Sequence, residues 1–214
     1  EPIKSAHGLN IALHVVSPTP CAAGDALCEL ATAAAGKHGS PPLSVNAPLA
    51  RTPPPRPEII LVIGGAGDVG RLRLLLSSAR AAMVRNIVLV ATDDDLIPSL
   101  GADAPAESIR AAELGPLSAH AGGAGEMPRT LLKWRLVEAL LGYGVGVMYL
   151  DAATVMLRDP FKSIYRDADI ETMSLGWDDP SAYGYNHVID DPSMGFTRFC
   201  HGSRIGGYEP NVFY

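Results

Sequence analysis

A glycine-rich turn lies between an apolar run and a helical pattern, where it could hold a phosphate group. Gly65, Gly67 and Gly70 follow the run Ile59 to Ile63 and precede Arg71 to Arg85, which carries apolar residues at helical spacing. Glycine lets the backbone approach a phosphate, and the N–H groups at a helix start favour its negative charge. Yet the chain has 22 glycines among 214 residues, so this spacing alone is weak evidence.

Carboxylates follow two other apolar runs, at positions where a nucleotide fold uses them. Ile87 to Val90 is followed by Asp93-Asp94-Asp95, and Val145 to Leu150 is followed by Asp151. In open α/β sheets, ligands bind outside the carboxyl ends of the strands, and a dinucleotide fold places an acid there for the ribose. The pattern therefore predicts that the glycine turn and these acids contribute to one nucleotide site.

The elements needed to position these residues indicate an α/β domain. Val145 to Leu150 has the length and composition of a central parallel strand. Before it, Thr130 to Leu141 predicts a helix, with Thr130 as its cap and Gly142 or Gly144 at its end. The order strand, helix, strand, loop, helix, strand predicts a mainly parallel sheet flanked by helices, with the three apolar runs as adjacent buried strands. The expected buried face of the second helix consists of Leu132, Leu136, Val137, Leu140 and Leu141.

Proline content separates the start of the chain from the rest. Residues 36–57 contain seven prolines and no sustained periodicity, which is typical of a linker or an extended arm. We therefore expect an N-terminal arm and proline-rich linker at residues 1–57 and a domain at residues 58–214. Ala22 to Ala35 could add a short alanine-rich helix. Because the numbering begins at Glu1 without a methionine, we expect a processed or truncated chain.

Charge and hydropathy argue against two classes of partner. The formal net charge of -6 and the isoelectric point near 5.4 disfavour a broad surface for nucleic acid. No segment reaches 18 consecutive apolar residues, so the sequence predicts no membrane span.

Cys21 and Cys28 lie seven residues apart. They could close a disulfide loop in an oxidising compartment or remain free buried thiols.

Residues 133–179 carry a series of motifs in a fixed order: Lys133, Gly144, Asp151, Asp159-Pro160-Phe161, Ala168-Asp169-Ile170 and Asp178. In order and approximate spacing, this stretch resembles the nucleotide-diphospho-sugar transferase family of plants and algae, which includes arabinosyl- and xylosyltransferases. The likeness extends more loosely over residues 58–214. The chain stops where the family would continue, so we expect the C-terminal part of the domain to be missing.

The resemblance implies a GT-A-like Rossmannoid fold, with a mainly parallel sheet flanked by helices, and a nucleotide-sugar donor. In that family, a divalent metal ion (Mn²⁺ or Mg²⁺) on a D-x-D motif holds the diphosphate. Here the motif reads Asp151-Ala152-Ala153, so the second carboxylate is replaced by alanine. A hard divalent cation needs carboxylate oxygens to hold it and to offset its charge. We therefore expect metal binding through Asp151 to be weakened.

Other site residues are implied by their place in the family's motifs. In GT-A transferases of this kind the nucleoside is uridine, which lies against the strand ends. Gly65 and Gly67 would belong to the turn that admits it, and Asp93 would contact the base or ribose. Lys133 would either steady a phosphate or be an ordinary solvated helix residue. In the family, an acid near Asp178-Asp179 lies close to the donor sugar, so Asp178 and Asp179 are the candidate catalytic residues.

Three functional hypotheses follow. The first is an enzyme that transfers a sugar from a nucleotide diphosphate to a glycan or glycoprotein, in the secretory pathway lumen (Golgi or ER) or outside the cell. The second is a catalytically inactive transferase fold that acts as a structural or binding subunit of a larger assembly, which Asp151-Ala152-Ala153 favours. The third is an NAD(P)-binding Rossmann protein, although the Tyr-x-x-x-Lys of a short-chain reductase is absent from the sequence.

Overall fold

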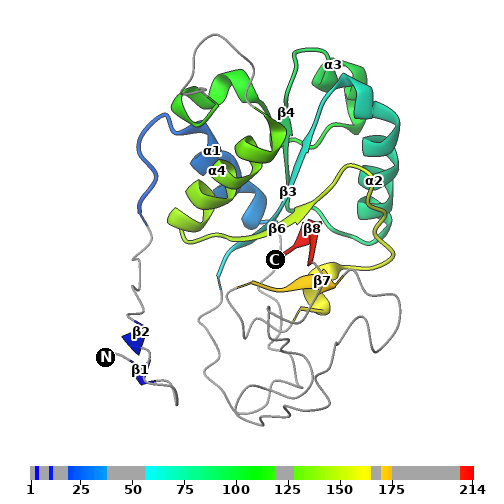
Figure 1. Ribbon diagram of the computed structural model, residues 1–214. Coiled ribbons are helices and arrows are strands. Elements are labelled where there is room, and N and C mark those ends of the chain that lie inside the picture. The colour runs from blue at the N-terminus through cyan, green and yellow to red at the C-terminus, as the bar shows by residue number, and fades with distance from the viewer. Residues whose placement is uncertain are drawn as a thin grey trace.

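The computed structural model describes residues 3–4, 10–11, 19–37, 56–118, 128–164, 170–174 and 208–214 (Figure 1). Within these residues, one six-stranded sheet has the order β5-β4-β3-β6-β8-β7, and a separate pair joins β1 (Ile3–Lys4) to β2 (Asn10–Ile11). The strands of the large sheet are β3 (Glu58–Gly64), β4 (Ile87–Ala91), β5 (Ser108–Arg110), β6 (Gly146–Leu150), β7 (Thr172–Ser174) and β8 (Tyr208–Phe213).

The sheet is mixed and mostly parallel. β3 pairs in parallel with both β4 and β6, and β4 pairs in parallel with β5. β8 is antiparallel to its two neighbours, β6 and β7. All residues of β3, β4 and β6 are buried. The structure therefore confirms the α/β class and the prediction that the three apolar runs form adjacent buried strands.

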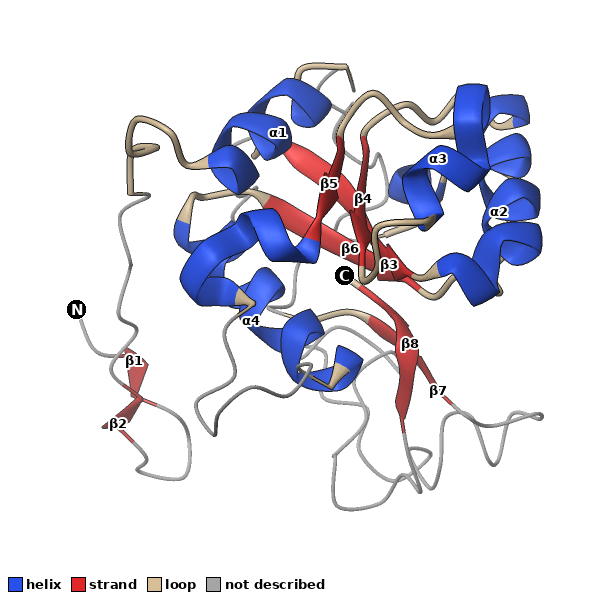
Figure 2. Cartoon of the chain, turned by 90° about the horizontal axis from the view of Figure 1, so that it is seen from above, coloured by secondary structure: helices blue, strands red, loops and turns tan. Residues whose placement is uncertain are grey.

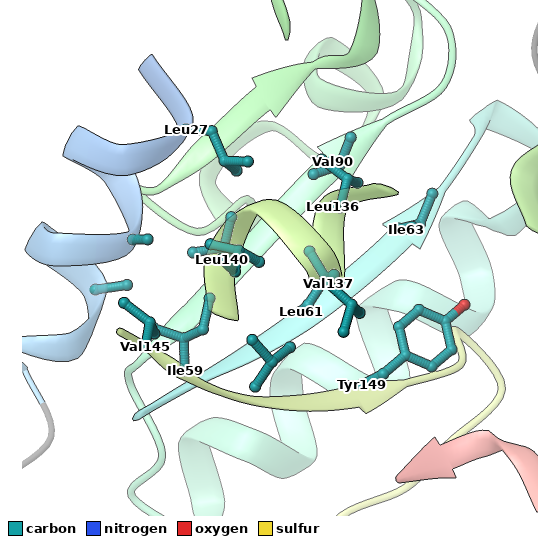
Figure 3. Close-up of a cluster of buried hydrophobic side chains, with 14 of the residues drawn as sticks. Leu27, Ile59, Leu61, Ile63, Val90, Leu136, Val137, Leu140, Val145 and Tyr149 are labelled. Carbon is teal, nitrogen blue, oxygen red and sulfur yellow. The ribbon is translucent and has the colours of Figure 1, made fainter. Parts of the chain in front are cut away.

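Helices cover both faces of the sheet (Figures 1 and 2). α1 (Ala26–Ala35) and α4 (Arg129–Gly142) pack on one face, and α2 (Val69–Ala81) and α3 (Leu96–Leu100) pack on the other. Successive residues of a strand point to opposite faces. Ile59, Leu61 and Ile63 therefore join the first core, shown in Figure 3, while Ile60 and Val62 join the second.

Two details of α4 differ from the sequence prediction. The helix begins at Arg129 after the cap residue Pro128, so the prediction of Thr130 as the cap was wrong. Leu141 is 54% exposed, whereas Leu136 and Leu140 are fully buried. Successive helix residues are rotated by about 100°, and this rotation turns Leu141 away from the sheet. The helix ends at Gly142, one of the two glycines predicted to end it.

The helix before the proline-rich segment packs on the sheet. Leu27, Ala31 and Ala34 of α1 lie in the same core as β3 and α4. A disulfide joins Cys21 to Cys28, which decides between the two thiol states considered from the sequence. The division of the chain at residue 57 stays a prediction, but α1 contributes to the core of the domain.

Tyr143→Phe is expected to lower the free energy of unfolding by about 0.5–1.5 kcal/mol at pH 7. The Tyr143 hydroxyl donates to Asp25 Oδ2 at 2.7 Å and so links the end of α4 to the start of α1. Burial, together with the hydrogen bond to Asp25 and its charge, raises the pKa of Tyr143 to about 12.

The effect of Tyr143→Phe on stability should depend on pH in the alkaline range. Because the folded-state pKa of Tyr143 exceeds its unfolded value of about 10, its contribution is present below pH 10 and is lost as the pH rises towards 12. The stability difference between wild type and variant should therefore shrink above pH 10, as measured by urea unfolding. A difference that stays constant up to pH 11 would contradict this assignment.

Candidate functional site

A pocket of about 230 Å³ opens where β3 and β6 reach their carboxyl ends. These two strands are parallel neighbours, so their carboxyl ends lie at the same edge of the sheet. This is the edge at which open α/β sheets bind ligands. The lining residues are Ile63, Asp68, Arg71, Arg129, Thr130, Lys133, Tyr149, Asp151, Ala152 and Asn211.

The carboxylate that sequence reasoning missed at this pocket is Asp68. It lies in η1 (Ala66–Asp68), the short turn between β3 and α2. Its Oδ2 accepts the backbone N–H of Gly65 at 3.1 Å and a guanidinium N–H of Arg129 at 2.7 Å. Burial raises the pKa of Asp68, but these hydrogen bonds and the charges of Arg129 and Arg71 outweigh burial, so the pKa lies below its ordinary value. Asp68 is therefore ionised at neutral pH.

The position of Gly65 has no room for a side chain. A Cβ at this position would lie 2.5 Å from both Arg129 Nη2 and Asp93 Oδ2, and 2.8 Å from Thr92 Oγ1. At Gly67, by contrast, a Cβ would meet no atom within 4 Å. Neither glycine lines the pocket, and their predicted contacts with a nucleoside stay predictions.

Asp93 joins two turns at the same edge of the sheet. One carboxylate oxygen accepts the N–H of Ala66 at 2.7 Å, and the other accepts the N–H of Leu96, at the start of α3, at 3.0 Å. Asp93 does not line the pocket. Its contact with a base or ribose stays a prediction, whereas its role in holding the glycine turn is visible in the structure.

Lys133 lies inside the pocket wall and is only 6% exposed. The interpretation of this lysine as a solvated helix residue was therefore wrong. Its Nζ lies 4.8 Å from the ring centroid of Trp134, 4.9 Å from that of Tyr149 and 5.8 Å from that of Phe213. The Phe213 ring stacks against both other rings, at centroid distances of 5.1 and 5.5 Å. These rings stabilise the ammonium group by cation–π attraction.

Tyr149 provides a neutral hydroxyl beside these charges. Burial, and then the negative charge of Asp151, raise the pKa of Tyr149 to about 12. The hydroxyl is therefore protonated at neutral pH and able to donate a hydrogen bond.

Asp151 lies where the strand-end motif predicted it, directly after β6, and it lines the pocket. Its Oδ1 accepts the N–H of Ala153 at 2.9 Å, and its own N–H donates to the carbonyl of Asn211 at 2.9 Å. The side chain of Ala153 is exposed and offers no oxygen.

The described side chains do not fit a divalent cation. Over the described ranges, no group of three His, Cys, Asp or Glu residues is arranged to hold a metal. Asp151 instead shares its pocket with Arg71, Arg129 and Lys133, which would repel a cation. Asp178-Asp179, predicted as catalytic, lies outside the described residues, so this test does not extend to that pair.

The Asp159-Pro160-Phe161 motif is structural in this chain. Asp159 Oδ1 accepts the N–H of Phe161 at 3.0 Å and caps η4 (Pro160–Lys162). The Phe161 side chain is fully buried against the second core. The motif thus fixes the course of the chain after Asp151.

Comparison with known proteins shows the family of this chain. Residues 82–203 match the sequence profile described as nucleotide-diphospho-sugar transferase. The chain belongs to this family. The matched residues make up more than half of the chain and include β4, β6 and the strand end at Asp151. No solved structure matches the chain significantly.

Two curated relatives of this transferase family come from Arabidopsis thaliana. Arabinosyltransferase RRA2 is 32% identical over 160 residues, which cover 73% of this chain and 36% of the relative. Arabinosyltransferase RRA1 is 30% identical over 164 residues, which cover 73% of this chain and 39% of the relative. The chain therefore spans less than two fifths of the length of these relatives.

Proposed function

We propose that this chain is the nucleotide-sugar-binding part of a glycosyltransferase. The observation that carries the proposal is the pocket at the ends of β3 and β6, whose wall holds Arg71, Arg129 and Lys133. Arginine and lysine are the side chains that bind phosphate groups. Family membership supports a nucleotide diphosphate sugar as the donor, and the names of the two relatives support a pentose such as arabinose. The proposed acceptor is a glycan or glycoprotein.

Such a site would act on the departing diphosphate. Transfer of a sugar leaves negative charge on the nucleotide, and positioned cations stabilise that charge in a water-poor site. In this pocket, Lys133 of α4 supplies a buried cation. Tyr149 of β6 supplies a neutral hydroxyl that can donate a hydrogen bond. Asp178 and Asp179 remain the proposed acids near the sugar.

Release of UDP from a panel of UDP-pentoses and UDP-hexoses tests this function. The proposal predicts release above background for at least one donor, with an increase on addition of an acceptor glycan. Lys133→Met should reduce the release because it removes the buried cation while keeping a similar apolar volume.

A second candidate is a transferase fold that binds the nucleotide without turnover, as a subunit of a larger assembly. Ala153 favours this candidate, since it removes one carboxylate of the strand-end motif. UDP binding without UDP release from any donor would support it over the enzyme.

The proposed compartment is the lumen of the secretory pathway, either Golgi or ER, or the cell exterior. The disulfide between Cys21 and Cys28 supports an oxidising compartment. None of the helices in the described parts of the chain has the length and hydropathy to cross a bilayer.

Ala153→Asp is expected to increase Mn²⁺-dependent UDP affinity about tenfold, which corresponds to about 1.4 kcal/mol. The new carboxylate would stand two residues after Asp151 and restore a second oxygen ligand with negative charge. Ala153 is exposed, so the substitution should not disturb the core. Calorimetric titration of UDP with and without Mn²⁺ measures the effect.

The matched control is Ala153→Asn, which has the same shape without the charge and should show little gain. An Ala153→Asp variant that folds normally but gains no Mn²⁺ dependence would contradict the expectation that a carboxylate at this position completes a metal site.

A further inference from the structure

We propose that the pocket holds the diphosphate of its ligand with the side-chain cations Arg71, Arg129 and Lys133, in place of a divalent metal ion. The inference rests on the proposed function for the identity of the ligand. The anion site itself follows from the side chains of the pocket.

The cations reach the pocket from two helices. Arg129 and Lys133 lie four residues apart in the first part of α4, so they lie on the same face of that helix. Arg71 comes from the first turn of α2, and all three residues line the pocket. Two helices on opposite faces of the sheet thus direct positive charge towards one cavity.

Asp68 and Asp151 are the carboxylates among the described lining residues, and both make contacts of their own. Asp68 pairs with Arg129 at 2.7 Å and lies 3.9 Å from Arg71. Asp151 uses one oxygen to accept the N–H of Ala153. Among the lining residues that the structure describes, three cations stand beside two carboxylates, a composition that suits a diphosphate better than a divalent cation.

Lys133 is the central residue of this arrangement. Its ammonium group is buried among the rings of Trp134, Tyr149 and Phe213, which restrict its position. A charge fixed in a buried wall acts more strongly on a ligand than the same charge in water. Together with Arg71 and Arg129, Lys133 supplies the positive charge that a metal ion on an Asp-x-Asp motif would otherwise supply to the diphosphate.

Calorimetric titration with inorganic pyrophosphate and with UDP, each in EDTA and each in Mn²⁺, tests the inference. We expect both ligands to bind in EDTA, with affinities within about threefold of those in Mn²⁺. Arg71→Gln and Lys133→Met should each lower pyrophosphate affinity in EDTA at least about tenfold, because each removes a charged hydrogen-bond donor.

Arg73→Gln is the matched control. Arg73 lies on the same helix as Arg71, but it donates to the carbonyl of Ser99 and pairs with Asp103 outside the pocket. Its substitution should leave pyrophosphate affinity unchanged. Arg71 is 69% exposed at its side chain, so Arg71→Gln should fold normally even if Lys133→Met does not.

The outcomes separate this inference from the proposed function. The inference is overturned if UDP binds only in Mn²⁺. It is also overturned if the Arg71→Gln variant binds pyrophosphate as tightly as the wild type does. Either result leaves the proposed function standing. Pyrophosphate binding in EDTA that depends on Arg71 and Lys133 supports the inference. If UDP and UDP-sugars then bind no more tightly than pyrophosphate, the anion site stands and the proposed function fails.

Discussion

Gly65→Ala should lower the free energy of unfolding by about 1–3 kcal/mol, the usual effect of an added group in a packed site. The new Cβ would lie 2.5 Å from Asp93 Oδ2 and from Arg129 Nη2. Arg129 can move because its guanidinium ends a flexible chain. Asp93 is held by the N–H groups of Ala66 and Leu96, so its displacement also costs hydrogen bonds. Because Arg129 lines the pocket, UDP affinity should fall as well.

Gly67→Ala is the control for this substitution, since its Cβ would meet no atom within 4 Å. It should be neutral or slightly stabilising, because alanine restricts the unfolded chain more than glycine does. Urea unfolding and UDP calorimetry on both variants measure the contrast. Equal stabilities for the two variants would mean that Gly65 is not packed as described.

Phe161→Ala is expected to lower the free energy of unfolding by about 3–5 kcal/mol, as is typical when a buried phenylalanine is truncated. Phe161 is fully buried and makes an edge-to-face contact with Tyr214 at a centroid distance of 6.3 Å. It anchors the segment after Asp151 against the core formed by α2 and the sheet. Thermal and urea unfolding measure the loss.

The matched control for Phe161 comes from the same segment. Leu157 is 93% exposed, so Leu157→Ala should change stability by no more than about 0.5 kcal/mol. A Phe161→Ala variant with the stability of Leu157→Ala would show that the Asp159-Pro160-Phe161 motif does not anchor the chain.

The central strands were predictable because their sequences are almost continuously apolar. Ile59 to Ile63 and Ile87 to Val90 are buried on both faces, which requires helices on both sides and leaves few alternatives to a parallel sheet. The other three strands of the large sheet are different. β5 and β7 have three residues each, and β8 includes Glu209 and Pro210, so no apolar run marks them.

The site was predictable where a strand end fixes a residue, and less so where tertiary packing decides. Asp151 follows β6 directly, so its place at the pocket follows from the strand. The surroundings of Lys133 include Phe213, which is 80 residues away in sequence and is brought there by the pairing of β6 with β8. The ion pair of Asp68 with Arg129 likewise joins distant segments, with no signal in either local sequence.

Calorimetric titration of the chain with UDP, with NADH in parallel, tests the central claim most directly. We expect measurable UDP binding that responds little to Mn²⁺, because Arg71, Arg129 and Lys133 line the pocket at the ends of β3 and β6. NADH also carries a diphosphate, but it should bind more weakly than UDP, because the chain belongs to the nucleotide-diphospho-sugar transferase family. NADH affinity equal to or above that for UDP, or no UDP binding with or without Mn²⁺, would contradict the central claim.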